Sequence, residues 1–234
     1  MTRLTAILVF TFLVQMSSYG QGGGTKVFRG GGGYVSLGTN IFNMASLDNS
    51  LGRYELSEFG SGQINYTIGG GGGSFINRLY FGGYGEAHIG PSASNEFYKN
   101  KMSGGQGLVQ VGYALVHKAS FVLYPTFGAG GGGTTLKVDA GPQYAEDPDL
   151  LLQPGARLHT RYMLLKLGLN SDFFIGPKTN SSGGLMLGFS AGYQFSPLVK
   201  RWEFDDRSVQ ELGKYDPSGF YLRLKIGWAS NQPQ

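Results

Sequence analysis

The amino-acid sequence predicts an all-β fold: an eight-stranded antiparallel up-and-down transmembrane β-barrel. Three observations carry the prediction. Segments of about ten residues alternate apolar with polar side chains, short and long connections alternate between these segments, and the last segment, Phe220 to Trp228, has one wholly apolar face. Strands of a membrane barrel turn apolar side chains to lipid and polar side chains to the lumen. A short helix is expected in the first extracellular loop.

The N-terminus has the pattern of a secretory signal peptide. Arg3 precedes an apolar run over residues 4–14, and the small residues Ser18 and Gly20 suit cleavage after Gly20. The apolar run is too short to span a bilayer as a helix. Residues 1–20 are therefore expected to be removed on export.

The remaining chain is divided by pattern into three parts. We expect a periplasmic N-terminal segment at 21–32, the barrel at 33–228 and a C-terminal tail at 229–234. The chain contains no Cys, so neither a disulfide nor lipid attachment at Cys is expected. Its net charge of +4 comes from scattered Lys and Arg, which does not indicate nucleic-acid binding.

The first four predicted strands run over about 33–42, 63–75, 79–89 and 106–117. Each alternates with a period of two, as a strand with two unlike faces requires. The outward apolar positions are Val35, Leu37, Ile41, Ile64, Tyr66, Ile68, Leu79, Phe81, Ile89, Val109, Val111 and Leu115. The opposite faces carry polar, aromatic or small residues, among them Tyr34, Asn40, Asn65, Tyr84, Glu86, His88 and Gln110.

The last four strands are expected at about 121–136, 160–174, 185–195 and 220–228. Their outward positions include Leu123, Phe127, Met163, Leu167, Leu169, Leu187, Phe189, Leu222 and Leu224. Pro125 cannot donate to a ladder, so a bulge near a turn is expected there. The Gly runs at 69–73 and 130–133 suit a narrow barrel with little interior room.

The connections alternate in length, which fixes the expected topology. Tight turns are expected at 76–78 and 118–120, and a fairly short one at 176–183. Long loops are expected at about 44–62, 90–105, 137–159 and 196–218. Short turns are typically periplasmic in such barrels. An even strand count then predicts an outer-membrane location with both termini in the periplasm.

The inward ionisable residues are the sharpest chemical feature. A lumen ion-pair network is expected from Glu86, His88, Lys166, Asp172, Arg223 and Lys225. Charges within a membrane must pair or be hydrated, and Glu86 is the expected first partner of both Arg223 and Lys225. The network would either fill the lumen or gate a narrow ion path.

A catalytic role is not favoured, and no catalytic residue, metal or cofactor is assigned. His117 lies beside Ser120 at a turn, on the lipid face by parity, while His88 shares the lumen face with Glu86. His159 follows a loop with Glu146, Asp147 and Asp149, which would suit a hydrolase at the rim but also fits a solvated loop.

The first long loop has helical spacing at Leu47, Leu51 and Tyr54, with Ser46 or Asp48 as candidate caps. It is interpreted as a helix packed on the barrel mouth or a lid over a small apolar cavity. The later loops carry cations that could meet anionic lipopolysaccharide and aromatics that suit the interface. These are Lys99, Lys101, Lys200 and Arg201, and Phe97, Tyr98 and Trp202.

From Gly33 to Trp228 the chain resembles the small outer-membrane β-barrel proteins of Gram-negative bacteria, of OmpA/OmpX type, without a peptidoglycan-binding domain. The resemblance rests on the strand pattern and on the last strand, Gly219-Phe220-Tyr221-Leu222-Arg223-Leu224. It implies that Gly219, Phe220, Leu222, Leu224 and Trp228 form the signal read by the barrel-assembly machinery during biogenesis.

The expected function is a structural or adhesive outer-membrane protein, or a partner subunit of an outer-membrane assembly. Outer-membrane lipid, lipopolysaccharide and other outer-membrane proteins are the expected partners. The alternatives are a narrow gated channel or transporter for ions or a small hydrophobic molecule, and a lipid-modifying hydrolase. A soluble lipocalin-like barrel is the competing fold.

Overall fold

The computed structural model describes residues 28–53, 56, 58–59, 64–118, 120–141, 155–175, 184–204, 207–209 and 212–233. The predicted signal peptide at 1–20 lies outside the described residues. So do 21–27 of the predicted periplasmic segment, the turn at 176–183, and Tyr54 of the proposed lid.

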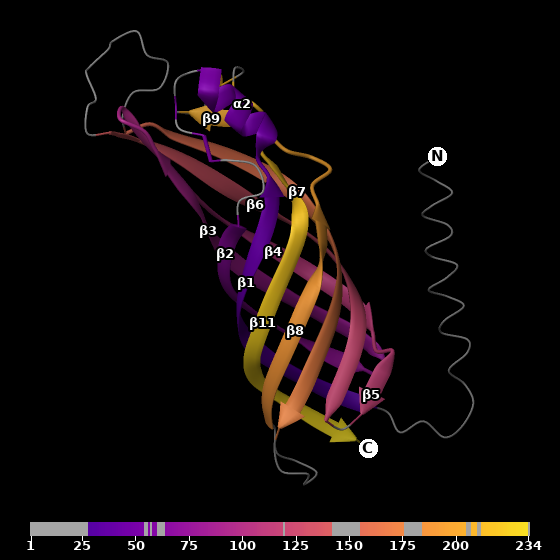
Figure 1. Cartoon of the computed structure of the whole chain (residues 1–234). Helices are drawn as coiled ribbons and strands as arrows, with labels where there is room; N and C mark the ends of the chain where they lie inside the picture. Colours follow the sequence, from indigo (N-terminus) through magenta and orange to yellow (C-terminus); the bar gives the residue numbers. More distant parts are fainter. Residues whose placement is uncertain are drawn as a thin grey trace, which may run out of the picture.

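Eight long antiparallel strands close into a barrel (Figure 1). They are β1 (Phe28–Asn43), β2 (Ile64–Ile76), β3 (Leu79–Ser94), β4 (Tyr98–Tyr113), β6 (Phe121–Ala140), β7 (Arg157–Ile175), β8 (Gly184–Phe195) and β11 (Asp216–Pro233). Each pairs with its neighbour in chain order, and β1 pairs with β11 to close the sheet. The predicted barrel and its strand number are confirmed.

Four short elements complete the described chain. The helix α2 (Ala45–Arg53) and the strands β9 (Trp202–Phe204) and β10 (Arg207–Val209) lie at the end with the long loops (Figure 1). The strand β5 (Val116–Lys118) lies at the opposite end and pairs with β6.

The barrel strands run further than the predicted bounds of 33–228. β1 begins at Phe28, opposite Pro233 of β11, and the ladder between them continues without a break to Phe42 opposite Gly219. Residues 28–32 and 229–233 are therefore part of the sheet, so the predicted N-terminal segment ends too late and the predicted tail begins too early. The Gly-rich start of β1 lacked the alternation on which the prediction depended.

The tight-turn end of the barrel also holds both ends of the described chain. Ile76 pairs with Leu79 across a two-residue turn in which Asn77 has a φ of 57°, a left-handed conformation that Asn tolerates. Because Phe28 pairs with Pro233, the chain enters and leaves the barrel at this same end.

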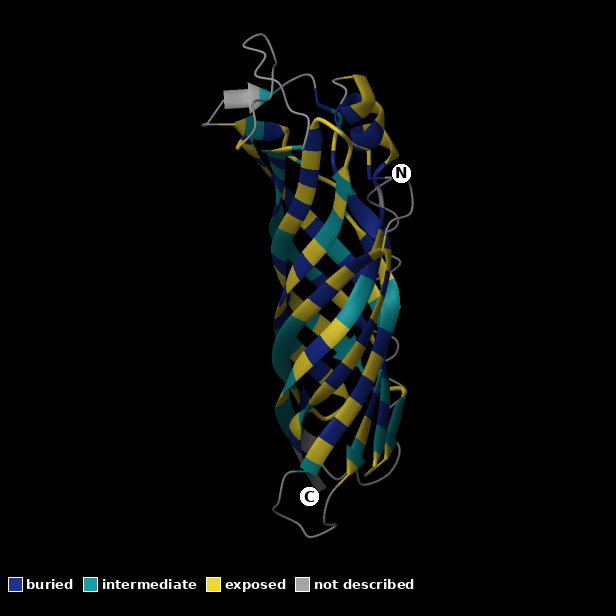
Figure 2. Cartoon of the chain, turned by 60° about the vertical axis from the view of Figure 1, so that its left-hand side comes forward, coloured by how far each residue is buried: buried dark blue, intermediate teal, exposed yellow. Residues whose placement is uncertain are grey.

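Side chains alternate between the outside and the inside along every barrel strand (Figure 2). Val35, Leu37 and Leu224 point outward and are each more than 60% exposed. Their neighbours in the sequence, Ser36 and Arg223, are buried. Within the described residues, no helix is both long and apolar enough to cross a membrane.

Pro125 sits where the neighbouring strand is interrupted. The pairing of β4 with β6 ends at Gly112 opposite Thr126, and it resumes in β5 with Val116 opposite Leu123. The missing N–H of Pro125 therefore costs no ladder bond on that side. The interruption also breaks the inside–outside alternation between β4 and β5. His117 of β5 therefore stacks on the inward-facing Phe75 and is not directed to the outside as predicted.

Inward glycines such as Gly71 occur where a neighbouring strand approaches closely. A Cβ placed on Gly71 would lie 2.5 Å from Gly83 O and from Tyr84 Cβ of the neighbouring strand β3, so the adjacent strand leaves no room for a side chain. Gly107 faces outward, and a Cβ there would meet nothing closer than Tyr84 O at 3.9 Å. Gly71 and Gly107 thus differ in whether the surrounding backbone leaves room for a side chain.

Replacing these two glycines tests that distinction. We expect Gly71→Ala to lower the free energy of unfolding by about 1–3 kcal/mol, because overpacking forces the backbone to shift. Gly107→Ala is the matched control and should change it by less than about 0.5 kcal/mol. Urea unfolding of the purified barrel measures both, and equal effects would contradict the assignment.

Candidate functional site in the barrel lumen

The centre of the lumen is crossed by an ion pair between Glu86 of β3 and Arg223 of β11. Arg223 Nε donates to Glu86 Oε2 at 2.6 Å, and Nη2 contacts both Glu86 Oε1 and Asn40 Oδ1. Both side chains are at least 95% buried. The carboxylate also accepts from Gln106 Nε2. A bidentate guanidinium–carboxylate pair is the strong form of this interaction, and the predicted pairing of Glu86 with Arg223 is confirmed.

Lys225 has a different partner from the one predicted. Its Nζ lies 2.6 Å from Asp172 Oδ1, which makes a second buried ion pair. Lys225 is two residues after Arg223 on β11, so this pair lies closer to the tight-turn end. Tyr124 OH donates to Asp172 Oδ2 at 2.6 Å, and Lys225 Nζ lies 3.3 Å from Asn170 Oδ1. The expectation that Lys225 pairs with Glu86 is wrong, because Arg223 already occupies both oxygens of that carboxylate.

The other two predicted network members are in the lumen but outside the ion pairs. Lys166 Nζ donates to Tyr84 OH and lies 3.6 Å from the centroid of the Tyr221 ring. A cation over an aromatic face is stabilised by the ring quadrupole. His88 Nε2 is 3.1 Å from Thr134 Oγ1, with its ring edge-on to Phe42. Neither forms an ion pair with a described residue.

Sequence reasoning missed the neutral groups that surround these charges. Tyr34, Tyr84, Tyr124 and Tyr221 place their rings beside the cations. Gln194 accepts from Gln106 Nε2 at 3.2 Å and so extends the hydrogen-bond chain across the barrel. The signal was available, because each tyrosine occupies an inward position of its strand. Only the ionisable residues were selected as functional.

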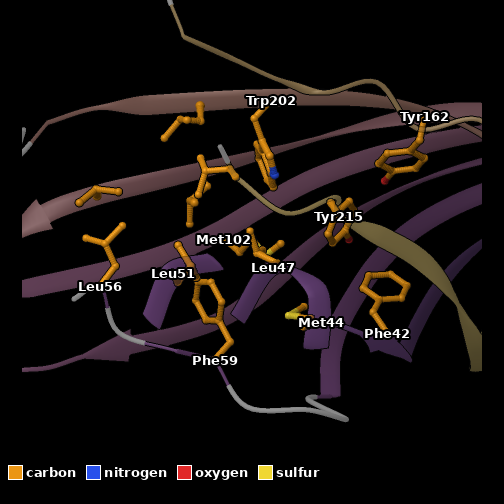
Figure 3. Packing of buried hydrophobic residues seen from close by; sticks show 14 of the residues in the cluster. Phe42, Met44, Leu47, Leu51, Leu56, Phe59, Met102, Tyr162, Trp202 and Tyr215 are labelled. Atoms are coloured by element: carbon orange, nitrogen blue, oxygen red, sulfur yellow. The ribbon is translucent and has the colours of Figure 1, made fainter. Parts of the chain in front are cut away.

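An apolar cluster fills the mouth of the barrel above the charged layer (Figure 3). Its side chains come from the end of β1, α2, the loop after it, β4, β6, β7, β9 and the segment before β11. Its fully or nearly fully buried members include Phe42, Met44, Leu47, Leu51, Leu56, Phe59, Met102, Leu136, Val138, Leu158, Leu164, Trp202 and Tyr215. We call this set the mouth plug. Burial raises the pKa of Tyr215 well above its usual value, so its phenol is neutral.

Hydrogen bonds hold α2 against the plug. Gly213 N donates to Ser50 Oγ at 2.8 Å, and Gly213 O accepts from Trp202 Nε1 at 3.0 Å. Asp48 Oδ1 accepts from Phe59 N at 2.8 Å. The helix begins at Ala45, so Ser46 and Asp48 lie inside it and are not the predicted caps. Leu47 and Leu51 are 0% exposed, which places them in a packed core and not over an open cavity.

Two aromatics predicted for the membrane interface are buried in the mouth. Trp202 and Tyr98 are 1% and 4% exposed, and both belong to the mouth plug. The sequence pattern of the loops did not indicate which side chains would point inward. For Trp202, the inward direction follows from the pairing of β9 with β7, which was not predicted. Phe97, in contrast, is 45% exposed at the tip of the hairpin between β3 and β4.

The residues of the predicted assembly signal lie as the strand pattern indicates. Phe220, Leu222, Leu224 and Trp228 all point outward on β11, and Gly219 is buried against the backbone of Ile41. Their recognition by the assembly machinery stays a prediction.

A small cavity lies in the lumen at the tight-turn end, below Asp172. Its volume is about 30 Å³, enough for one or two waters. The wall is mostly apolar and aromatic, with Phe75, Tyr80, Tyr124 and Phe174 facing the bare backbone of Gly30–Gly32. A second space of about 10 Å³ lies among Lys166, Arg223 and Lys225. The ion pair of Asp172 with Lys225 separates the two.

The histidines do not assemble a hydrolytic site among the described residues. His159 Nδ1 lies 2.9 Å from Thr135 Oγ1 on the outer surface, but no hydrogen bond joins it to a described carboxylate. No group of three or more His, Cys, Asp or Glu that could hold a metal occurs in the described part of the chain. Glu146, Asp147 and Asp149 lie outside it.

Comparison with family models and with curated proteins finds no match to the sequence. Among solved structures, three show limited similarity to the chain. They are Ail, the attachment invasion locus protein of Yersinia pestis (11% identity, 88% of this chain and 100% of that one, TM-score 0.43), neisserial surface protein A (12%, 88% and 97%, 0.35), and the outer-membrane protease OmpT of Escherichia coli (7%, 88% and 95%, 0.34). Similarity of this degree carries no information about activity.

The Glu86–Arg223 pair gives a direct stability test. Glu86→Ala should lower the free energy of unfolding by about 3–5 kcal/mol, because it leaves a buried guanidinium without its partner. The double variant Glu86→Ala with Arg223→Met removes both charges and should recover most of that loss. Urea unfolding in detergent measures the cycle; additive effects in the double variant would show that the pair is not coupled.

The mouth plug gives a second test. Leu51→Ala should cost about 2–5 kcal/mol, as expected for a large buried side chain. It should also expose the segment around α2 to added protease. Arg53→Ala, at an exposed position of the same helix, is the control and should leave cleavage unchanged. Protection of 45–59 in both variants would mean that the plug does not hold the helix.

Proposed function

We propose that the chain is an integral outer-membrane β-barrel protein with a filled lumen. Its role is structural or adhesive, or that of a partner subunit in a larger outer-membrane assembly. The observation that carries the proposal is the belt of exposed apolar side chains around all eight barrel strands, enclosing buried charges. Water would solvate neither surface favourably in that arrangement, whereas a bilayer outside and an ion-paired interior satisfy both.

The strand lengths support this position. β8 has 12 residues and carries apolar outward side chains throughout, close to the roughly 9–11 residues with which a tilted strand crosses a bilayer. β6 and β7 have 20 and 19 residues. The excess lies at the mouth, where outward residues such as Lys137 and Arg157 are polar while Leu136 and Leu158 remain buried.

The form of the mouth supports a binding or structural role. The mouth plug makes the projecting part of the barrel a packed, rigid platform. Phe97, Leu198 and Phe204 are 45%, 63% and 39% exposed at this end, on segments outside the eight-strand belt. Exposed apolar side chains on a rigid surface are typical of contact with another protein.

A narrow gated channel is the second candidate. The two small cavities on either side of the Asp172–Lys225 pair favour it, because they would lie along one luminal path if that pair and the Glu86–Arg223 pair opened. The mouth plug argues against it. A lipid-modifying hydrolase has no comparable support from the described histidines, and we propose a non-enzymatic role.

Localisation and conductance test these proposals together. The chain expressed in a Gram-negative host should appear in the outer-membrane fraction and require detergent for extraction. Recovery without detergent would support a soluble barrel and overturn the proposal.

In planar bilayers the wild-type barrel should not conduct. Conductance that rises in Glu86→Ala would support the gated channel. Silence of both forms, with the variant shown to be folded by circular dichroism, would exclude it. Leu51→Ala, which loosens the plug alone, separates a gate at the mouth from one at the ion pairs.

A further inference from the structure

The outer surface just above the apolar belt carries cations on three adjacent strands. Lys101 of β4 lies directly opposite Lys137 of β6, and Lys137 lies directly opposite Arg157 of β7. Two further cations flank this row, Lys99 on β4 and Arg161 on β7. We call these five residues the cationic face.

The row is unfavourable without an anion. Residues directly opposite on neighbouring strands have Cβ atoms about 5 Å apart, and like charges there are destabilising. Lys137 is the one member whose charge is met within the described chain, by Asp139 at 2.7 Å. Lys99, Lys101, Arg157 and Arg161 are exposed and form no ion pair with a described residue. Among the described residues, the cationic face therefore has one ion-paired carboxylate, Asp139, which also lies opposite Lys99 in register.

The surroundings add to the positive charge. Lys200 N donates a backbone hydrogen bond of 2.8 Å to Arg161 O, so Lys200 lies beside Arg161. Arg201 is the next residue in the chain. Glu203, opposite His159, is the nearby carboxylate on this edge. The sequence analysis predicted that Lys99, Lys101, Lys200 and Arg201, on two different loops, could meet anionic lipopolysaccharide. The register of β4, β6 and β7 joins them to Lys137, Arg157 and Arg161.

The position of the cationic face relative to the belt selects the occupant. Met163, two residues below Arg161 on β7, is 48% exposed and begins the apolar belt on that strand. Between the belt and the Lys101–Lys137–Arg157 row lie Ser103, Thr135 and His159, opposite one another in register. Counted outward from Met163, Arg161 is one side-chain row above the hydrocarbon boundary, the Lys101–Lys137–Arg157 row is three above it and Lys99 is four above it, with hydroxyls between them. That is the level of a lipid headgroup.

We propose that the cationic face binds the phosphorylated headgroup of an outer-leaflet glycolipid of the lipid A class. The cations contact the phosphate groups, and the hydroxyls of Ser103 and Thr135 face the sugar. Phosphate accepts charge-assisted hydrogen bonds from both Lys and Arg, which suits a mixed cluster. The inference rests on the proposed membrane position and adds a ligand to it. Gly105 and Gly133, in register with Arg161, leave space beneath the headgroup.

The test is binding of bis-phosphorylated lipid A to the full chain purified in detergent, followed by native mass spectrometry. The triple variant Lys101→Gln, Arg157→Gln, Arg161→Gln should bind about a hundredfold more weakly, given roughly a factor of five per basic residue near such a surface. Arg78→Gln with Lys118→Gln removes two exposed cations at the opposite end and is the matched control. The control should bind as the wild type does.

Three outcomes would overturn the proposal. Equal binding by the wild type and the triple variant would remove the site. Equal binding of dephosphorylated lipid A would remove the phosphate contacts. Competition by inorganic phosphate at the same concentration as lipid would show anion binding without lipid recognition. Because the assay is done in detergent on folded protein, its failure leaves the membrane fractionation result intact, and the two proposals fail separately.

Discussion

Closure of the sheet by the β1–β11 ladder is the constraint on which the rest of the structure depends. In a bilayer no water can satisfy an exposed strand edge, so every backbone group of the belt must find its partner in the neighbouring strand. The ladder from Phe28 opposite Pro233 to Phe42 opposite Gly219 supplies those partners. The closed ring of eight strands then fixes the width of the interior, and that width decides which side chains the lumen can hold.

A lumen this narrow must be filled by residues that neutralise one another. Inward glycines such as Gly71 occur where a neighbouring strand approaches too closely for a side chain, and the remaining positions hold two ion pairs, a lysine over tyrosine rings and a chain of amides. Burial of an ion pair is costly unless its hydrogen bonds are complete. Asn40 and Gln106 add hydrogen bonds to the Arg223–Glu86 pair, and Tyr124 and Asn170 add them to the Lys225–Asp172 pair. The set is not complete, because Arg223 Nη1 is buried without a hydrogen-bond partner among the described residues.

The sequence was sufficient for the strands, their faces and the strand number, because each outward apolar residue repeats with a period of two. The partners of the lumen charges were only half predictable. Parity places Glu86, Asp172, Arg223 and Lys225 inside, but the choice of Asp172 for Lys225 depends on the register of β7, β8 and β11. That register sets both residues opposite Gly188, and the alternation pattern does not fix it. The mouth plug was beyond reach for a related reason: Trp202 and Tyr215 come from a long irregular segment, whose burial follows from tertiary contacts and not from periodicity.

The two tryptophans of the chain occupy opposite environments. Trp202 is enclosed in the mouth plug, and Trp228 is 61% exposed on the outside of β11 near the tight-turn end. Each therefore reports on one process alone through its fluorescence. Trp228 responds to the hydrocarbon phase as the barrel inserts, and Trp202 responds to packing of the mouth. The order in which the apolar belt and the mouth plug form during folding can therefore be measured from the fluorescence of these two native residues, without any added label.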